Sequence, residues 1–134
     1  DVDMAWRLRR VGWQARIVPK AVAYHYRGMY GKEASGLMAR IGNRRKKSGQ
    51  RNYYSTRNHW LLLIKNLRWG NGILAIPWIL PYEIGRMFYI IILESSSLKA
   101  IGDVLKLFPK MLTKRKALKS AVTASAKELR SWFL

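Results

Sequence analysis

The chain has 134 residues, a formal net charge of +19 and no cysteine, so disulfide bonds, cysteine zinc sites and thiol nucleophiles are excluded. Its length gives room for one domain with a modest core, and a hydrophobic content of 49% excludes a disordered basic tail. The charge indicates anionic partners: a membrane surface, nucleic acid or a phosphorylated substrate.

The first predicted element is a helix over residues 2–11. Apolar residues recur there at helical spacing, and Asp3 stands one turn before Arg7, where the two side chains can pair. Gly12 is a natural stop for this helix. Two short β-strands are predicted next, over residues 14–18 and 21–26.

Residues 27–51 are typical of a connection because they carry five glycines and a basic run. A short helix near residues 33–41 is the element that fits within it. A longer helix over residues 52–67 follows, and Asn66 with the glycines beyond it is expected to end that helix.

The most apolar stretch covers residues 73–93. A single spanning helix needs about 20 apolar residues without central charges. Since Pro77, Pro81, Glu83 and Arg86 interrupt the stretch, two short segments lying in a membrane interface fit better than one span.

An amphipathic helix is predicted over residues 98–112, with a capping box at Ser125 and Glu128 opening a last short helix. The apolar side of the helix over residues 98–112 is expected to hold Leu98, Ile101, Leu105, Phe108 and Leu112. Its polar side is expected to hold Lys99, Asp103, Lys106 and Lys110. Such basic, aromatic helices fit a membrane surface, although a soluble helical core is the alternative.

Four motifs mark the N-terminal stretch. They are Asp1-Val2-Asp3-Met4-Ala5-Trp6-Arg7, Gly12-Trp13, Val18-Pro19 and Tyr24-His25-Tyr26-Arg27. Together they closely resemble the last catalytic stretch of family 2 glycosyltransferases, especially the bacterial rhamnosyltransferase-like members. Tyr54, Arg57-Asn58 and Lys65-Asn66 extend the resemblance more weakly.

The resemblance implies a larger inverting enzyme whose nucleotide-binding part precedes Asp1, so that this chain is inactive alone. The expected fold class is mainly α with a short β segment. On this interpretation, residues 1–30 form the C-terminal edge of a doubly wound α/β catalytic domain of GT-A type. Residues 31–51 form a basic glycine-rich connection, and residues 52–134 a helical, membrane-associated region.

The resemblance also assigns the catalytic base. In the family, the second residue of an acidic pair takes the proton of the acceptor hydroxyl, and Asp1 matches that position. An exposed terminal residue or a helix cap is the alternative for Asp1. Asp3 is expected to be structural, orienting the helix through Arg7, with contact to the acceptor as its alternative.

His25 matches the family's metal-ligating histidine. The cofactor implied for the intact enzyme is a divalent metal, Mn²⁺ or Mg²⁺, whose other ligands come from an Asp-X-Asp motif that this sequence lacks. A packed strand residue is the alternative for His25, and His59 is expected to be structural.

A set of cations near His25 is the candidate substrate site. Such side chains can hold the diphosphate of a donor or attract a phospholipid-linked acceptor, although a solvated charged loop is the alternative. The set consists of Arg27, Arg44, Arg45, Lys46, Lys47 and Arg51.

The expected partners are therefore a nucleotide-sugar donor, a cell-envelope polysaccharide or lipid-linked acceptor, and an anionic membrane surface. The expected place is the cytoplasmic face of the bacterial inner membrane, in a peripheral or monotopic position. Two other functions remain open: a basic nucleic-acid-binding protein and a non-catalytic membrane-binding protein. Nucleic acid is not expected, because no zinc-finger, RNP or helix-turn-helix signature is visible. The membrane-binding function leaves the motifs from Asp1 to Arg27 unexplained.

Overall fold

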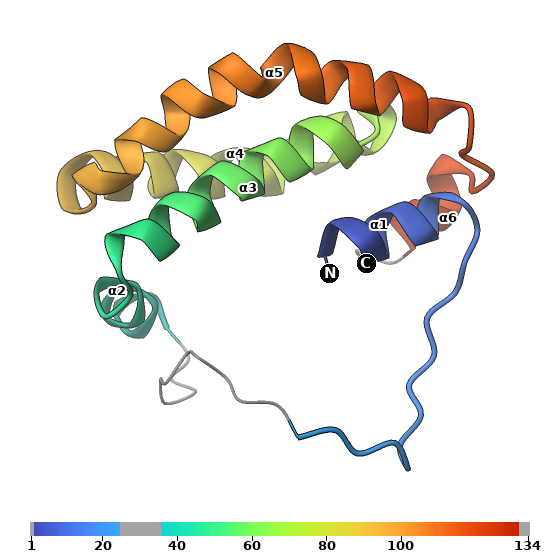
Figure 1. Cartoon of the computed structure of the whole chain (residues 1–134), viewed down its shortest axis with the longest axis horizontal. Helices are drawn as coiled ribbons and strands as arrows, with labels where there is room; N and C mark the ends of the chain where they lie inside the picture. Colours follow the sequence, from blue (N-terminus) through green and yellow to red (C-terminus); the bar gives the residue numbers. More distant parts are fainter. Residues whose placement is uncertain (1, 25–35, 132–134) are drawn as a thin grey trace. The chain divides into compact units, whose positions relative to one another are not determined.

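The structure is a computed structural model that describes residues 2–24 and 36–131. The described residues are mainly helical, as expected (Figure 1). The elements are α1 (Val2–Arg10), α2 (Leu37–Arg45), α3 (Gly49–Asn66), α4 (Trp69–Leu93), the 3-10 helix η1 (Ser95–Ser97), α5 (Leu98–Lys119) and α6 (Ala126–Arg130).

The chain divides into two compact units. The larger unit joins Asp1–Gln14 to Gly49–Leu134 and holds every helix except α2, which belongs to the smaller unit, Ala15–Ser48. Helix α3 begins at Gly49, three residues earlier than the sequence predicts, so it includes the last residues of the expected connection.

The expected short β segment is wrong for residues 14–18 and 21–24, which form no strand. The Ala21 amide donates to the Val18 carbonyl at 3.0 Å, which closes a turn between the two expected strands. A strand needs a neighbour to pair its amides and carbonyls, and alternation of side chains does not supply one. Residues 25 and 26 of the second expected strand lie outside the described residues.

The end of α1 confirms the predicted stop at Gly12. Gly12 has a φ of +86°, its amide donates to the Arg9 carbonyl at 3.1 Å, and the Trp13 amide donates to the Leu8 carbonyl at 3.0 Å. This pair of bonds is a Schellman motif, which a glycine completes without strain. The Arg10 carbonyl in turn accepts from two amides after α5, those of Thr123 and Ala124, both at 3.1 Å.

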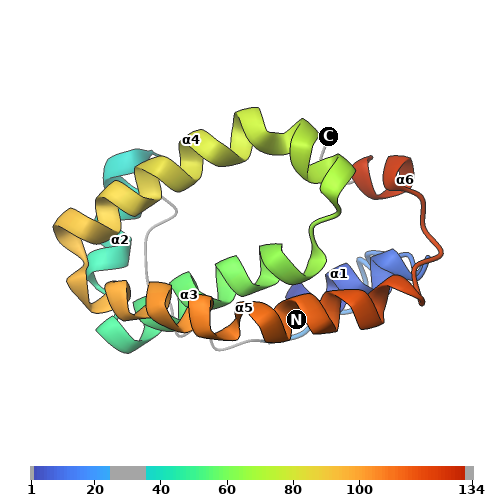
Figure 2. The same cartoon turned by 90° about the horizontal axis from the view of Figure 1, so that it is seen from above.

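Helices α3 and α5 pack side by side (Figures 1 and 2). Thr56 of α3 and Ala100 of α5 are fully buried, and Val104 and Met111 continue the packed face of α5. The side expected to be the apolar face of α5 is largely exposed instead: Leu105 is 68% and Phe108 is 43% exposed. The small and slender side chains on the packed face let the two helices approach closely, which a row of large side chains would prevent.

Helix α4 corrects the expectation of two short segments, because it continues through both Pro77 and Pro81. A proline removes one helical hydrogen bond and crowds the preceding turn, which bends a helix without having to end it. By helical spacing both prolines lie on the side away from Glu83. Figure 2 shows α4 arched, with its convex side away from α3 and α5.

The predicted capping box at the start of α6 is confirmed. The Glu128 amide donates to Ser125 Oγ at 3.1 Å, and the Ser125 amide donates to Glu128 Oε2 at 2.6 Å. The bond from the Ser125 amide holds the pKa of the Glu128 carboxyl below its usual value.

Candidate functional site at the junction of α1 and α3

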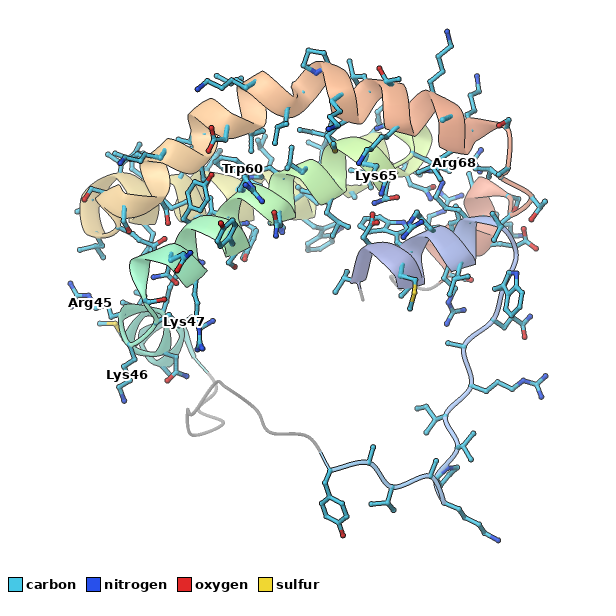
Figure 3. All side chains as sticks on the ribbon, viewed as in Figure 1. Arg45, Lys46, Lys47, Trp60, Lys65 and Arg68 are labelled. Carbon is cyan, nitrogen blue, oxygen red and sulfur yellow. The ribbon has the colours of Figure 1, made fainter. Side chains whose placement is uncertain are left out.

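Asp3 is the centre of a cluster that joins α1 to the end of α3. Its carboxylate accepts two bonds from Lys65 Nζ, at 2.8 and 2.9 Å, and one from Asn66 Nδ2 at 2.8 Å. The predicted pairing with Arg7 is also present, at 3.1 Å. Lys65 lies between the two helices (Figure 3). Three residues from two helices thus fix one carboxylate.

Helix ends explain why these residue types meet. Asp3 stands in the first turn of α1, where the helix dipole favours a negative charge. Lys65 stands in the last turn of α3, where the dipole favours a positive one. The two ends therefore carry complementary charges before they make contact.

The cluster sets the protonation of Asp3. Burial by itself raises the pKa of this carboxyl, but the hydrogen bonds from Lys65 and Asn66, with the charges of Lys65 and Arg7, outweigh burial and lower the pKa below its usual value. A carboxylate with a lowered pKa and several donors is a poor proton acceptor. Asp3 is suited to positioning α1 and not to acting as a base.

A hollow of 520 Å³ opens beside this cluster. Its polar lining includes Asp3, Asn58, His59 and Lys65, and its apolar lining includes leucines of α3 and Met111 of α5. Val2, the residue after Asp1, also lines it. The hollow, called the Asp3 hollow below, offers both donors and acceptors of hydrogen bonds to a ligand.

Three of the predicted site residues lie outside the described residues: Asp1, His25 and Arg27. Their roles as base, metal ligand and phosphate contact stay predictions. Among the described residues, no three histidine, aspartate or glutamate side chains gather where they could hold a metal ion. The implied Mn²⁺ or Mg²⁺ therefore finds no complete ligand set in the described part of the chain.

The other predicted phosphate contacts fall in different units. Arg44 and Arg45 form the last turn of α2, Lys46 and Lys47 follow it, and all four belong to the smaller unit (Figure 3). Arg51 lies in the first turns of α3, in the larger unit. Cations at the end of α2 also suit its dipole, which agrees with the alternative of a solvated charged segment.

Two polar clusters were missed by the sequence analysis. In the first, Glu83 of α4 binds α3: Trp60 Nε1 donates to Oε2 at 2.7 Å, and His59 Nε2 lies 2.6 Å from Oε1. In the second, Arg10 and Arg115 donate to carbonyls in the last turn of α3. A charged residue in an apolar stretch and cations near helix ends are the signals that could have pointed to them.

No protein-family model, curated protein or solved structure matches the chain. The residues and their geometry therefore carry the functional argument.

Proposed function

We propose that this chain is the C-terminal part of an inverting glycosyltransferase. The enzyme would transfer a sugar from a nucleotide-sugar donor to a cell-envelope polysaccharide or a lipid-linked acceptor. The motif from Asp1 to Arg7 suggests this class, and one structural observation supports it. Asp3 of that motif bonds to Lys65 and Asn66, the pair that extends the same resemblance far along the chain. Asn58, from a further matched pair, lines the hollow beside them.

The proposed division of labour follows from the cluster. Asp1 takes the proton of the acceptor hydroxyl, while Asp3, held by Lys65, Asn66 and Arg7, fixes the start of α1 and hence the backbone that carries Asp1. The Asp3 hollow offers the acceptor hydrogen-bonding groups next to that helix start.

We further propose that His25 is a ligand of a divalent metal in the intact enzyme. Such an ion supplies charge neutralisation for the leaving diphosphate. The described residues hold no complete ligand set, so the remaining ligands are proposed to come from the α/β domain that precedes Asp1 in the intact enzyme. Arg27, the run Arg44 to Lys47, and Arg51 are proposed to contact the diphosphate or an anionic acceptor.

The third part of the proposal is a monotopic position on the cytoplasmic face of the inner membrane. The Gly70–Leu93 part of α4 is long and apolar enough to cross a membrane. Its middle, however, is tied through Glu83 to Trp60 and His59 of α3, and α3 also carries arginine and lysine. A helix bonded at its middle to a neighbour that carries charged residues fits an interfacial position, with Trp78, 79% exposed, facing the lipid.

The catalytic proposal is tested first by the coding sequence upstream of Asp1. We expect an α/β domain with an Asp-X-Asp motif and an acidic residue directly before Asp1. Unrelated coding sequence, or a start codon directly before Asp1, would overturn the proposal.

The second test measures turnover of the intact enzyme. Asp1→Asn should lower turnover by about 10²–10⁴ while donor binding is kept, because a lost base typically has that effect. His25→Ala should weaken the binding of the metal ion and of the nucleoside diphosphate. Normal turnover in the Asp1 variant removes Asp1 from the mechanism, and unchanged metal dependence in the His25 variant makes that residue structural.

The membrane proposal is tested with vesicles. The chain should co-sediment with anionic vesicles. This binding should weaken as salt is raised, and a residual part should persist because exposed aromatic side chains contact the lipid. Equal binding to neutral vesicles contradicts the electrostatic part. Protease protection of residues 73–93, with the two flanks accessible from opposite sides, contradicts the interfacial position.

A further inference from the structure

A second hollow, of 640 Å³, lies at the C-terminal end of α3, and none of its described lining residues lines the Asp3 hollow. Its wall is formed by the end of α1, the connection between α3 and α4, the last turns of α5 and the loop that follows. Five cations line it, and no carboxylate does so among the described lining residues: Arg10, Arg68, Arg115, Lys116 and Lys119. This set defines the basic pocket.

Backbone contacts hold the three arginines in place. Arg10 donates to the Lys65 carbonyl at 3.5 Å, Arg115 to the Ile64 carbonyl at 2.7 Å, and Arg68 to the Ala124 carbonyl at 2.8 Å. The Ile64 and Lys65 carbonyls belong to the last turn of α3, which lacks helical donors. These bonds account for the position of the guanidinium groups, because a carbonyl dipole anchors a cation at a helix end.

Anchoring does not account for their convergence. Arg10 is only 6% exposed, and its Nε is buried without a hydrogen-bond partner among the described residues. Burial, and then the positive charges of Arg115 and Arg68, lower the pKa of Arg10. Glu128 does not line the basic pocket, and its carboxylate accepts from the Ser125 amide. Like charges brought together in this way repel each other, and a bound anion relieves the repulsion.

The shape of α5 adds a second property. Leu105, Phe108 and Leu112 lie on the same helical face as Lys116 and Lys119, so the face is apolar in its first half and cationic in its second. Leu112 lines the basic pocket and is 39% exposed, and Phe108, one turn earlier, is 43% exposed. An apolar strip thus leads up to the cations.

We propose that the basic pocket binds a phosphate group, carried either by the headgroup of an anionic lipid or by a soluble phosphate. Planar guanidinium groups donate paired hydrogen bonds to phosphate oxygens, and the flanking lysines add point charges. This inference does not depend on glycosyl transfer, because none of its residues belongs to the proposed catalytic site.

The site is tested on the full 134-residue chain by calorimetric titration with inorganic pyrophosphate. The variant Lys116→Gln with Lys119→Gln should bind about tenfold more weakly or worse, because charge-assisted hydrogen bonds are lost. The control, Lys106→Gln with Lys110→Gln, removes the same charge from the opposite face of α5. It should change affinity by less than about twofold, because exposed distant charges are screened.

The variant Arg68→Lys is an independent test, because it keeps the positive charge and removes the planar guanidinium group. Weaker pyrophosphate binding with an unchanged circular dichroism spectrum supports the site. The proposal is overturned if pyrophosphate does not bind, or if the two double variants weaken binding equally, since that result means general electrostatic attraction.

The two sources of phosphate are separated with vesicles of equal surface charge that contain phosphatidic acid or phosphatidylserine. A preference for phosphatidic acid that is abolished by pyrophosphate and by Lys116→Gln with Lys119→Gln assigns the pocket to a lipid headgroup. Equal binding that pyrophosphate does not displace overturns the lipid source and leaves a soluble phosphate as the ligand.

Discussion

The α3–α5 pair and α4 are held in the same unit by different forces. Helix α5 packs on α3 through slender side chains such as Ala100 and Val104, both buried. Helix α4 is the most apolar helix, yet Ile90 is the one buried apolar residue among its described side chains, and its charged residue Glu83 makes the bonds to α3. The comparison teaches that shape and hydrogen bonding decide which helix faces are covered. Most of the apolar surface of α4 is left exposed, where it could contact the lipid of the proposed membrane.

The largest expected effect on stability comes from Ile90, the residue of α4 that is buried as Ala100 and Val104 of α5 are. Ile90→Ala should lower the free energy of unfolding by about 2–5 kcal/mol, because a fully buried side chain leaves a cavity. Ile92, 71% exposed on the same helix, is the matched control and should lose little when changed to alanine. Urea denaturation measures both. Equal losses would mean that α4 has no distinct packed face.

The polar link of α4 should come next. Glu83→Ala removes the acceptor of the Trp60 indole and should destabilise by about 1–3 kcal/mol, because a polar group loses its partner. Glu83→Gln keeps an acceptor oxygen and should lose less. Hydrogen exchange of α4 amides reports the release of this helix. Unchanged exchange in the alanine variant contradicts the proposed link.

The link between α1 and α3 should contribute less, and with a pH signature. The folded pKa of Asp3 is lowered, so its stabilisation is present at neutral pH and is lost as pH falls below the usual carboxyl pKa and through the folded one. Asp3→Asn should destabilise by about 1 kcal/mol at pH 7, because the pair is partly exposed and screened. Denaturation across a pH series should show the two proteins converging in acid. A constant gap would contradict this assignment.

The smallest effect is expected on the outer face of α5. Leu105→Ser should change the free energy of unfolding by less than about 0.5 kcal/mol, because Leu105 is 68% exposed, while vesicle binding should fall. Val104→Ser, on the packed face one residue away, should destabilise clearly instead. Unfolding of the Leu105→Ser variant would mean that Leu105 lies on the packed face of α5.

Features fixed by near neighbours in the chain could be predicted from the sequence. The stop at Gly12, the Asp3–Arg7 pair and the capping box of Ser125 and Glu128 each involve residues within one or two helical turns. The helix of residues 2–11 was expected for the same reason. Local backbone geometry and helix-end chemistry suffice for such features.

Features that depend on distant partners could not be predicted. A strand was predicted over residues 14–18, but no neighbouring strand pairs with this segment among the described residues. The apolar row of Leu105 and Phe108 suggested the covered face of α5, whereas α3 accepts the row of Ala100 and Val104. The bond between Asp3 and Lys65 could not be predicted for the same reason, since Lys65 lies 62 residues further along the chain.

The bonds from Thr123 and Ala124 to the Arg10 carbonyl have a consequence for how this chain can vary. They fasten Asp1–Gln14 into a body otherwise built from Gly49–Leu134, so Ala15–Ser48 is an excursion that leaves that body and returns to it. The entropic cost of closing a chain segment between two fixed ends grows only slowly, by about 0.6 kcal/mol for each doubling of its length. The excursion is therefore the part in which insertions, deletions or an exchanged segment cost the larger unit least.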